Sequence, residues 1–164
     1  MTPLRSVLSL VPALRRGEAL RYGGYRTQVE FLDFVVDGVR FGETLRGRDG
    51  GATVVSDLVS VLVPGWPGGF LDRQARRLLG QEPAELDDGR LALYVCPECG
   101  DLGCGAVTVT VRRTANEVVW ADPGWQTDYD PDIDAEGLTG LGPFRFERRQ
   151  YDAVLTQVLD RGKP

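Results

Sequence analysis

The sequence contains no histidine, and Lys163 is its single lysine. Without an imidazole, the Ser-His-Asp and Cys-His nucleophile systems and histidine-ligated metal sites are excluded. Carboxylate, thiol and arginine chemistry remain. We therefore expect a non-enzymatic protein. The alternative is an enzyme that works through carboxylates and arginines, with Arg73, Arg76 and Arg77 of one expected helix as the basic groups.

Long apolar runs are also absent. No stretch approaches the roughly 18–20 residues needed to cross a bilayer. The apolar patch over residues 7–14 is interrupted by Pro12 and followed by Arg15 and Arg16, without a small-residue cleavage site. Cysteines are few and odd in number, which is typical of a reducing compartment. We expect a cytoplasmic protein with no membrane association.

All three cysteines lie in one stretch, residues 91–113, that is predicted to form two strands joined by a tight turn. Apolar residues alternate with others on both sides of the cysteines, at Leu91, Leu93 and Val95 and again at Val107, Val109 and Val111. A period of two is typical of half-buried strands. Pro97, Gly100, Gly103 and Gly105 favour a tight connection between them. We expect this hairpin to lie in the middle of a sheet.

Further strands are predicted on both sides of this hairpin. Apolar residues change parity within the β-rich residues 25–36, which indicates a bulge. Asp37-Gly38 predicts a two-residue turn, followed by a return strand from Val39 to near Leu45. Asn116 turns the chain into a third strand over residues 117–120, and a long acidic loop then leads to an edge strand near residues 143–146.

The spacing of apolar residues predicts two helices, over residues 70–79 and 149–161. The chain of 164 residues is long enough for one hydrophobic core. The fold class that follows is α+β. We expect residues 1–164 to form a single domain, in which an antiparallel meander sheet of about five or six strands packs against the two helices. Residues 1–24 give no clear pattern.

The spacing Cys96-x-x-Cys99-x4-Cys104 defines what we call the cysteine knuckle, residues 96–104. Its thiolates have the spacing to share a tetrahedral zinc ion, but a structural site takes four protein ligands, so that Asp101 or Glu98 would be the fourth. A redox CxxC lies at the start of a helix, whereas this one leads into a glycine-rich turn. We favour cysteines that pack as small hydrophobes and bind no cofactor; zinc is the alternative.

An acidic, aromatic segment follows the third strand. Residues 114–144 carry seven acidic side chains and no lysine or arginine. The aspartates do not form an EF-hand, since Ile133 and Thr139 occupy the positions that require Gly and Glu. A weaker cation site of another type stays open, and so does a role in solubility alone. Aromatic anchors ringed by charge are typical of binding surfaces. Acidic faces repel nucleic acid and attract basic proteins. The predicted partner-binding residues are Trp120, Asp122, Trp125, Asp128, Tyr129, Asp130, Asp132, Asp134 and Glu136.

The order "YVCPECGDLGCGAVTV", then a tryptophan-bearing strand, then "PFRFERRQYDAVL" resembles a set of small, uncharacterised proteins of high-GC actinobacteria. These are similar to immunity proteins of toxin systems. The resemblance covers residues 91–155, and it implies an inhibitor without catalytic residues. We therefore expect a non-enzymatic immunity-type protein that binds a basic partner, such as a toxin or nuclease, through its acidic aromatic segment. The alternative is a zinc- or thiol-dependent structural or regulatory module centred on Cys96, Cys99 and Cys104.

Overall fold

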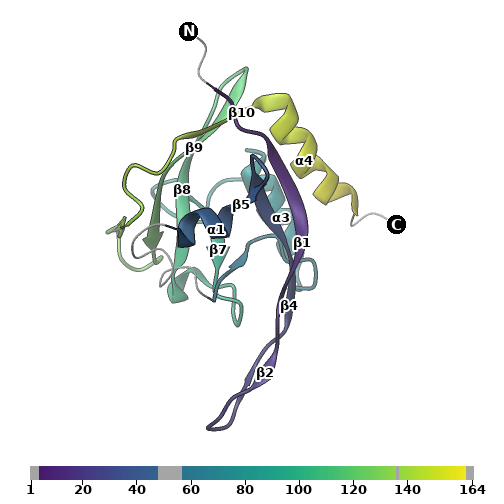
Figure 1. The fold of residues 1–164 in the computed structure, drawn as a ribbon. Helices are drawn as coiled ribbons and strands as arrows, with labels where there is room; N and C mark the ends of the chain where they lie inside the picture. Colours follow the sequence, from purple (N-terminus) through teal and green to yellow (C-terminus); the bar gives the residue numbers. More distant parts are fainter. Residues whose placement is uncertain (1–3, 48–56, 136, 162–164) are drawn as a thin grey trace.

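A computed structural model describes residues 4–47, 57–135 and 137–161 (Figure 1). The fold is α+β, as predicted. The described strands form an antiparallel sheet of order β10-β9-β8-β7-β6, a smaller sheet of order β1-β4-β5, and a β2-β3 hairpin. The elements are β1 (Leu8–Arg15), β2 (Glu18–Ala19), β3 (Tyr25–Arg26), β4 (Val29–Val36), β5 (Val39–Arg40), α1 (Phe41–Arg46), β6 (Val59–Ser60), α3 (Phe70–Leu78), β7 (Leu91–Val95), the 3-10 turn η1 (Leu102–Cys104), β8 (Ala106–Arg113), β9 (Glu117–Gln126), β10 (Phe144–Glu147) and α4 (Arg148–Arg161).

The hairpin that carries the cysteines lies in the middle of the larger sheet, as predicted. Strand β8 is its central strand and pairs with β7 on one side and β9 on the other. Leu91 lies opposite Val109, and Val95 opposite Ala106, with an irregularity between Ala92 and Tyr94. The cysteine knuckle therefore projects from one end of the sheet centre.

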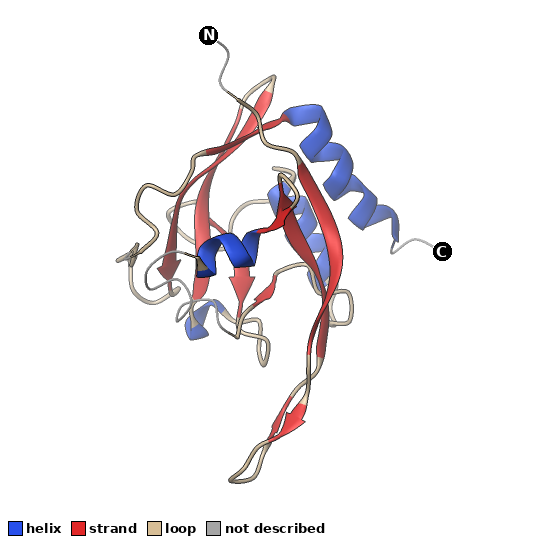
Figure 2. Ribbon diagram, viewed as in Figure 1, coloured by secondary structure: helices blue, strands red, loops and turns tan. Residues whose placement is uncertain are grey.

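Strands β1 and β4 lie between the two edges of the larger sheet. At the β6 edge, the Leu32 amide donates to the Leu62 carbonyl at 2.9 Å, and the Ser60 hydroxyl donates to the Leu32 carbonyl. At the β10 edge, the Ser6 amide donates to the Arg145 carbonyl at 2.6 Å. Open sheet edges invite pairing with other chains, and these contacts blunt both edges. The sheet is thus curled and nearly closed (Figure 2).

The core inside this curled sheet is centred on Trp120, which is fully buried. Its ring lies 5.4 Å from that of Phe34 and 5.0 Å from that of Phe146, edge to face. Its indole nitrogen donates to the Tyr151 hydroxyl at 3.2 Å, and that hydroxyl donates to the Leu78 carbonyl at 3.0 Å. Trp120 thereby joins the sheet to α4 and α3. Such aromatic contacts stabilise by about 0.5–1.5 kcal/mol each beyond the area they bury.

Both predicted helices are confirmed, and the turn before α1 is as expected. Helix α3 ends at Leu78 and is followed by Gly80 at φ 73°, a left-handed glycine of the kind common just after helix C-termini. Asp37 and Gly38 both have positive φ, at 53° and 83°, as a type I′ turn requires. The described residues include no helix with both the length and the apolar character of a membrane span.

The return strand predicted from Val39 to near Leu45 is wrong beyond Arg40. Strand β5 has two residues, and the chain then forms helix α1. Phe41 and Leu45 are both fully buried. Residues four apart share one face of a helix and also one face of a strand, so their spacing fits both. In helix α1 the two side chains lie about one turn apart, and both pack into the core.

The bulge predicted within residues 25–36 is also wrong. Strand β4 pairs with β1 in unbroken register, from Leu8 opposite Val36 to Arg15 opposite Val29. Consecutive residues Leu32 and Asp33 are both buried. A strand covered on both faces loses its polar-apolar alternation, which explains the change of parity.

The third strand continues beyond its predicted end at Trp120. Strand β9 extends to Gln126 through a bulge, since Thr110 lies opposite Ala121 while Thr108 lies opposite Gly124. The extra residue on β9 accommodates Pro123, which has no amide hydrogen for the ladder. The stretch interpreted as the start of an acidic loop is therefore a strand, and the loop begins after Gln126.

The N-terminal residues without a sequence pattern form strand β1 and an arm. Strands β1 and β4 continue into the β2-β3 hairpin, which projects from the body of the molecule (Figure 1). We call residues 17–27 the arm. At its tip Tyr22 is 93% exposed, and the Arg21 guanidinium lies over its ring.

Candidate functional site

The cysteine knuckle gathers three sulfur atoms at the surface. The Sγ atoms of Cys96, Cys99 and Cys104 all lie within 4.8 Å of one another. The Cys99 and Cys104 sulfurs are in contact at 3.1 Å. Cys99 and Cys104 are exposed and Cys96 is half-buried. The interpretation of the cysteines as buried hydrophobes is therefore wrong for the last two.

Local hydrogen bonds hold the loop between the cysteines. The Gly100 amide donates to the Cys96 carbonyl at 2.8 Å, which closes the first turn. The Asp101 carboxylate accepts from the Gly103 amide at 2.8 Å and so caps η1. The Asp101 amide in turn donates to the Cys99 sulfur at 3.3 Å. Residues 100–103 thus fix the backbone conformation of the loop and also supply a hydrogen-bond donor to the Cys99 sulfur.

Two tryptophans support the knuckle at its glycines. A Cβ placed on Gly100 would lie 2.6 Å from the Trp66 ring, and one placed on Gly105 would lie 1.8 Å from the Trp125 ring. Both glycines have positive φ, at 65° and 93°. Glycine is therefore required for backbone conformation and for close approach of the indole rings. The knuckle has little room to move between these rings.

The thiol cluster favours the protonated form of Cys99. Desolvation, together with the neighbouring Cys104 and Cys96 thiols, raises the pKa of Cys99 to about 12. Adjacent thiols resist ionisation together because the resulting charges repel. With no cation present, Cys99 is thus a neutral thiol at physiological pH, a poor nucleophile for redox catalysis.

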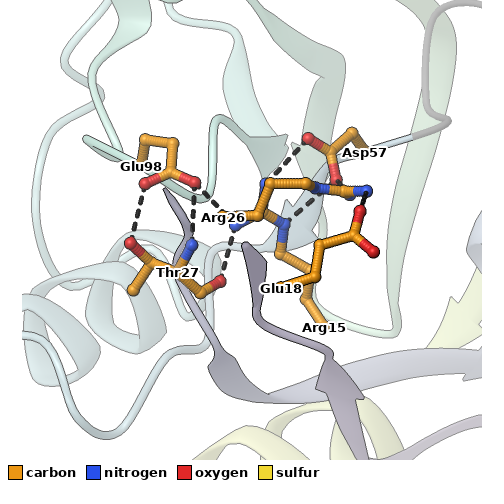
Figure 3. Close-up of polar contacts among 6 residues, drawn as sticks. All are labelled: Arg15, Glu18, Arg26, Thr27, Asp57 and Glu98. Carbon is orange, nitrogen blue, oxygen red and sulfur yellow. Dashed lines mark hydrogen bonds and ion pairs between the residues drawn. The ribbon is translucent and has the colours of Figure 1, made fainter. Parts of the chain in front are cut away.

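The two carboxylates considered as a fourth zinc ligand are both occupied. Asp101 caps η1 as described. The Glu98 carboxylate accepts from the Thr27 amide at 3.1 Å, from the Thr27 hydroxyl at 2.8 Å and from Arg15 at 2.7 Å (Figure 3). Arg15 lowers the pKa of Glu98 through this contact. Glu98 thus ties the knuckle to the base of the arm.

Two of the aromatic residues predicted to bind a partner are less exposed than a binding surface requires. Trp120 is fully buried, so its assignment to a binding surface is wrong. Its position on β9 faces the core, which the sequence could not show without the sheet topology. Trp125 is half-buried, with its indole against Gly105. Its backbone pairs with Asp134 through two hydrogen bonds of 2.7 and 2.8 Å.

The predicted acidic residues within the described chain are exposed. We call the acidic surface the set Asp122, Asp128, Tyr129, Asp130, Asp132 and Asp134, all of which are exposed. Glu136 lies outside the described residues. Tyr129 is 76% exposed. Two hollows of about 280 and 320 Å³ share Tyr129 and Asp130 in their walls, and the first extends to Asp87 and Asp88. The structure therefore brings most of the predicted residues together around one tyrosine.

A buried polar network beneath the acidic surface was not predicted. The Arg90 guanidinium, on a residue 6% exposed, donates to the Thr108 hydroxyl at 3.0 Å and to the Asp122 carbonyl at 2.6 Å. The Thr108 hydroxyl donates to Gln126 at 2.7 Å, and Gln126 donates to Asp88 at 2.7 Å. Burial lowers the pKa of Arg90. Thr108 within a run of valines was the one sequence signal for this network.

The arginines of α3 each donate to an acceptor close to their own helix. Arg73 donates to the Gly68 carbonyl, Arg76 to Gln81 and Arg77 to Glu85. The cavity where Arg77 meets Glu85 has a volume of about 20 Å³, which is close to that of one water.

Comparison of the chain with protein-family models, with curated proteins and with solved structures finds no match.

Proposed function

We propose that this protein is a non-enzymatic binding protein of the inhibitor or immunity type, which docks a basic protein such as a toxin or nuclease on its acidic surface. The observation that supports this most directly is the exposure of Tyr129 among aspartates. Tyrosine offers a large, rigid contact area at low conformational cost, and it is enriched among residues that dominate binding energy. A tyrosine at 76% exposure gains most of that energy when a partner covers it.

The charge around Tyr129 defines the chemistry of the partner. Asp128, Asp130 and Asp132 are exposed, and no ion pair links these three to a basic side chain among the described residues. Like charges held together raise the local negative potential and steer cations toward the surface. The hollows beside Tyr129 have room for protruding side chains such as arginine. A basic protein surface complements all of these features.

The proposal is tested by reversing these charges. We would identify the partner by affinity capture from the native host and then measure its dissociation constant by calorimetry. The triple variant Asp128→Lys, Asp130→Lys, Asp132→Lys should bind at least about 10-fold more weakly, with a reduced dependence on salt. Tyr129→Ala should bind more weakly by a similar factor, because it removes the aromatic contact.

The matched control reverses three exposed acids elsewhere, Glu30→Lys, Glu43→Lys and Glu147→Lys, and so produces the same change in net charge. This control should change the affinity by less than about 2-fold if the contact is local. Equal losses in the two triple variants would show that net charge alone governs binding, and the proposal for this surface would be wrong.

We also propose that the protein acts in the cytoplasm. Its three free cysteines support this, since clustered and exposed thiols persist in a reducing compartment.

A second candidate function is a thiol-dependent structural or regulatory module centred on the cysteine knuckle. The observation that favours it is the surface position of sulfur atoms that lie within 4.8 Å of one another. Thiol titration of the native protein tests it: the knuckle thiols should react as a cooperative group, whereas three independent rates would count against a shared role.

A further inference from the structure

We infer that Cys96, Cys99 and Cys104 form a binding site for one zinc ion, in which three thiolates come from the knuckle and the fourth ligand comes from solvent. The inference is independent of docking at the acidic surface, because it uses none of those residues. It rests on four observations: sulfur spacing, the support of the loop, the donor set, and access from solvent.

The sulfur atoms are already close to the spacing of a tetrahedral site. Zinc–sulfur bonds of about 2.3 Å place sulfur atoms about 3.8 Å apart along the edge of a tetrahedron. The three Sγ atoms lie within 4.8 Å of one another, and Cys99 and Cys104 lie at 3.1 Å. These separations differ from the tetrahedral edge by about 1 Å or less. A chain with three cysteines at random surface positions would not meet this condition.

The loop is held in the shape that the site requires. Trp66 packs on Gly100 within the knuckle and Trp125 packs on Gly105 directly after it, so that the loop is supported from two different segments. The Asp101 cap fixes η1, which carries Cys104 at its end. The Asp101 amide donates to the Cys99 sulfur at 3.3 Å, which helps to hold that side chain within the cluster. Ligands held in place before binding lose less entropy when the ion arrives.

The donor set selects the class of cation. Sulfur ligands are soft and favour zinc over magnesium or calcium, which take oxygen ligands. Glu98 and Asp101, the carboxylates within the knuckle, are held by Thr27, Arg15 and the Gly103 amide. Within the described residues, the group of adjacent potential metal ligands consists of the three cysteines, without either carboxylate. Cys99 and Cys104 are exposed, so that an ion and its solvent ligand can reach the site.

Metal binding has one chemical competitor at this site. Oxidation would join Cys99 to Cys104 as a disulfide, with two protons and two electrons passing to an external oxidant. Such a bond removes two of the three ligands and leaves Cys96 alone. Zinc binding and disulfide formation are thus mutually exclusive, and an experiment can distinguish them by mass.

The experiment uses the purified full-length chain, reduced with a phosphine, loaded with zinc sulfate and freed of excess metal. Native mass spectrometry should show one zinc per chain. Competition with a chromophoric chelator should show that Cys96→Ser, Cys99→Ser and Cys104→Ser each bind zinc more than about 100-fold more weakly, beyond the loss usual for groups that only support a ligand. Cobalt loading should give the sulfur-to-metal charge-transfer absorption of thiolate ligation.

The control is Asp101→Asn, which keeps an oxygen to cap η1 but removes the carboxylate charge. Its zinc affinity should stay within about 10-fold of the wild type, below the loss for a direct ligand. Circular dichroism of every variant establishes that the fold is intact. The inference would be overturned by a reduced, folded chain without zinc, by full affinity in Cys96→Ser, or by a chain that is two mass units lighter and metal-free under reducing conditions. A loss in Asp101→Asn equal to that of the cysteine variants would overturn the assignment of the fourth ligand to solvent.

Discussion

At the scale of single residues, the most demanding group in the core is the carboxylate of Asp33. This buried side chain accepts from Arg40 at 2.7 Å and from the Tyr94 hydroxyl at 2.7 Å. Burial, together with the nearby Asp33 charge, raises the pKa of Tyr94 well above its usual range. Tyr94 therefore stays a neutral donor. Among the described residues, Tyr94 and Arg40 are the groups seen to compensate the charge of Asp33, which is removed from water.

We predict that Tyr94→Phe lowers the free energy of unfolding by about 1.5–3 kcal/mol, the range for a hydrogen bond to a charged group. Urea denaturation measures the change. Tyr22→Phe is the matched control, because the Tyr22 side chain is 93% exposed, and it should change the stability by less than about 0.5 kcal/mol. Similar values for the two variants would show that the Asp33 contact does not stabilise the fold.

At the scale of elements, the connection between β7 and β8 depends on close contact between glycine and tryptophan. Gly105 has φ 93° and lies against Trp125 of β9, whereas Gly38 has φ 83° and nothing near the position of its missing Cβ. The two glycines share backbone strain and differ in steric contact. Comparing them separates the two contributions.

We predict that Gly105→Ala destabilises the protein clearly more than Gly38→Ala. A left-handed alanine costs about 1–2 kcal/mol at either site. Displacement of the Trp125 ring adds a further penalty of about 1–3 kcal/mol at Gly105, as for other overpacked sites. Thermal unfolding by calorimetry measures both variants. Equal losses would mean that Trp125 moves aside freely and does not hold the knuckle.

The sequence predicted those elements whose pattern is set locally. The β7-β8 hairpin, α3 and α4 have clear periodicity, and Asp37-Gly38 has the residues that its turn requires. Helix α1 was missed because it has six residues, and its two buried side chains also fit an extended strand. The predicted end of strand β9 was too early because Pro123 normally interrupts a central strand. A bulge accommodates this proline, and the bulge is set by pairing with β8, which the sequence does not show.

The sequence predicted the candidate sites less completely. It located the three thiols and the exposed aspartates. It placed Trp120 on the surface because acidic residues follow it in the sequence. In the fold, those residues are not neighbours of its indole ring. It gave the cysteines a packing role because free cysteine is commonly buried, while the exposure of Cys99 and Cys104 follows from the turn between β7 and β8.

At the scale of the whole molecule, the arm is attached to the body by a charged network. Asp57 accepts from Arg15 at 2.9 Å and also pairs with Arg26, while Arg26 pairs with Glu18 at 3.0 Å (Figure 3). Arg15 lowers the pKa of Asp57. Asp57 and Glu98 lie 42 and 83 residues from Arg15 in the sequence. No local sequence pattern therefore predicts this network.

We predict that acid loosens the arm. Because the folded-state pKa of Asp57 lies below its unfolded value of 3.8, its contribution is complete above about pH 4 and is lost as the pH falls through the folded-state value. Glu98, whose pKa Arg15 also lowers, acts in the same direction. Hydrogen exchange of residues 18–26, corrected for intrinsic rates, should increase between pH 5 and pH 3 before the sheet amides lose protection.

Asp57→Asn is the control for this prediction, since it lacks the titrating group while Arg15, Arg26, Glu18 and Glu98 remain. Its arm should exchange faster than that of the wild type at pH 5 and change less on acidification. An arm that responds to acid in the same way in both proteins would assign the effect to another group.

The position of Glu98 has a mechanical consequence. Its backbone lies between Cys96 and Cys99, while its carboxylate is bound at the base of the arm by Thr27 and Arg15. The cysteine knuckle and the base of the arm are therefore coupled through one side chain. A displacement of the knuckle that moves Glu98 would stretch or break its hydrogen bonds to Thr27 and Arg15.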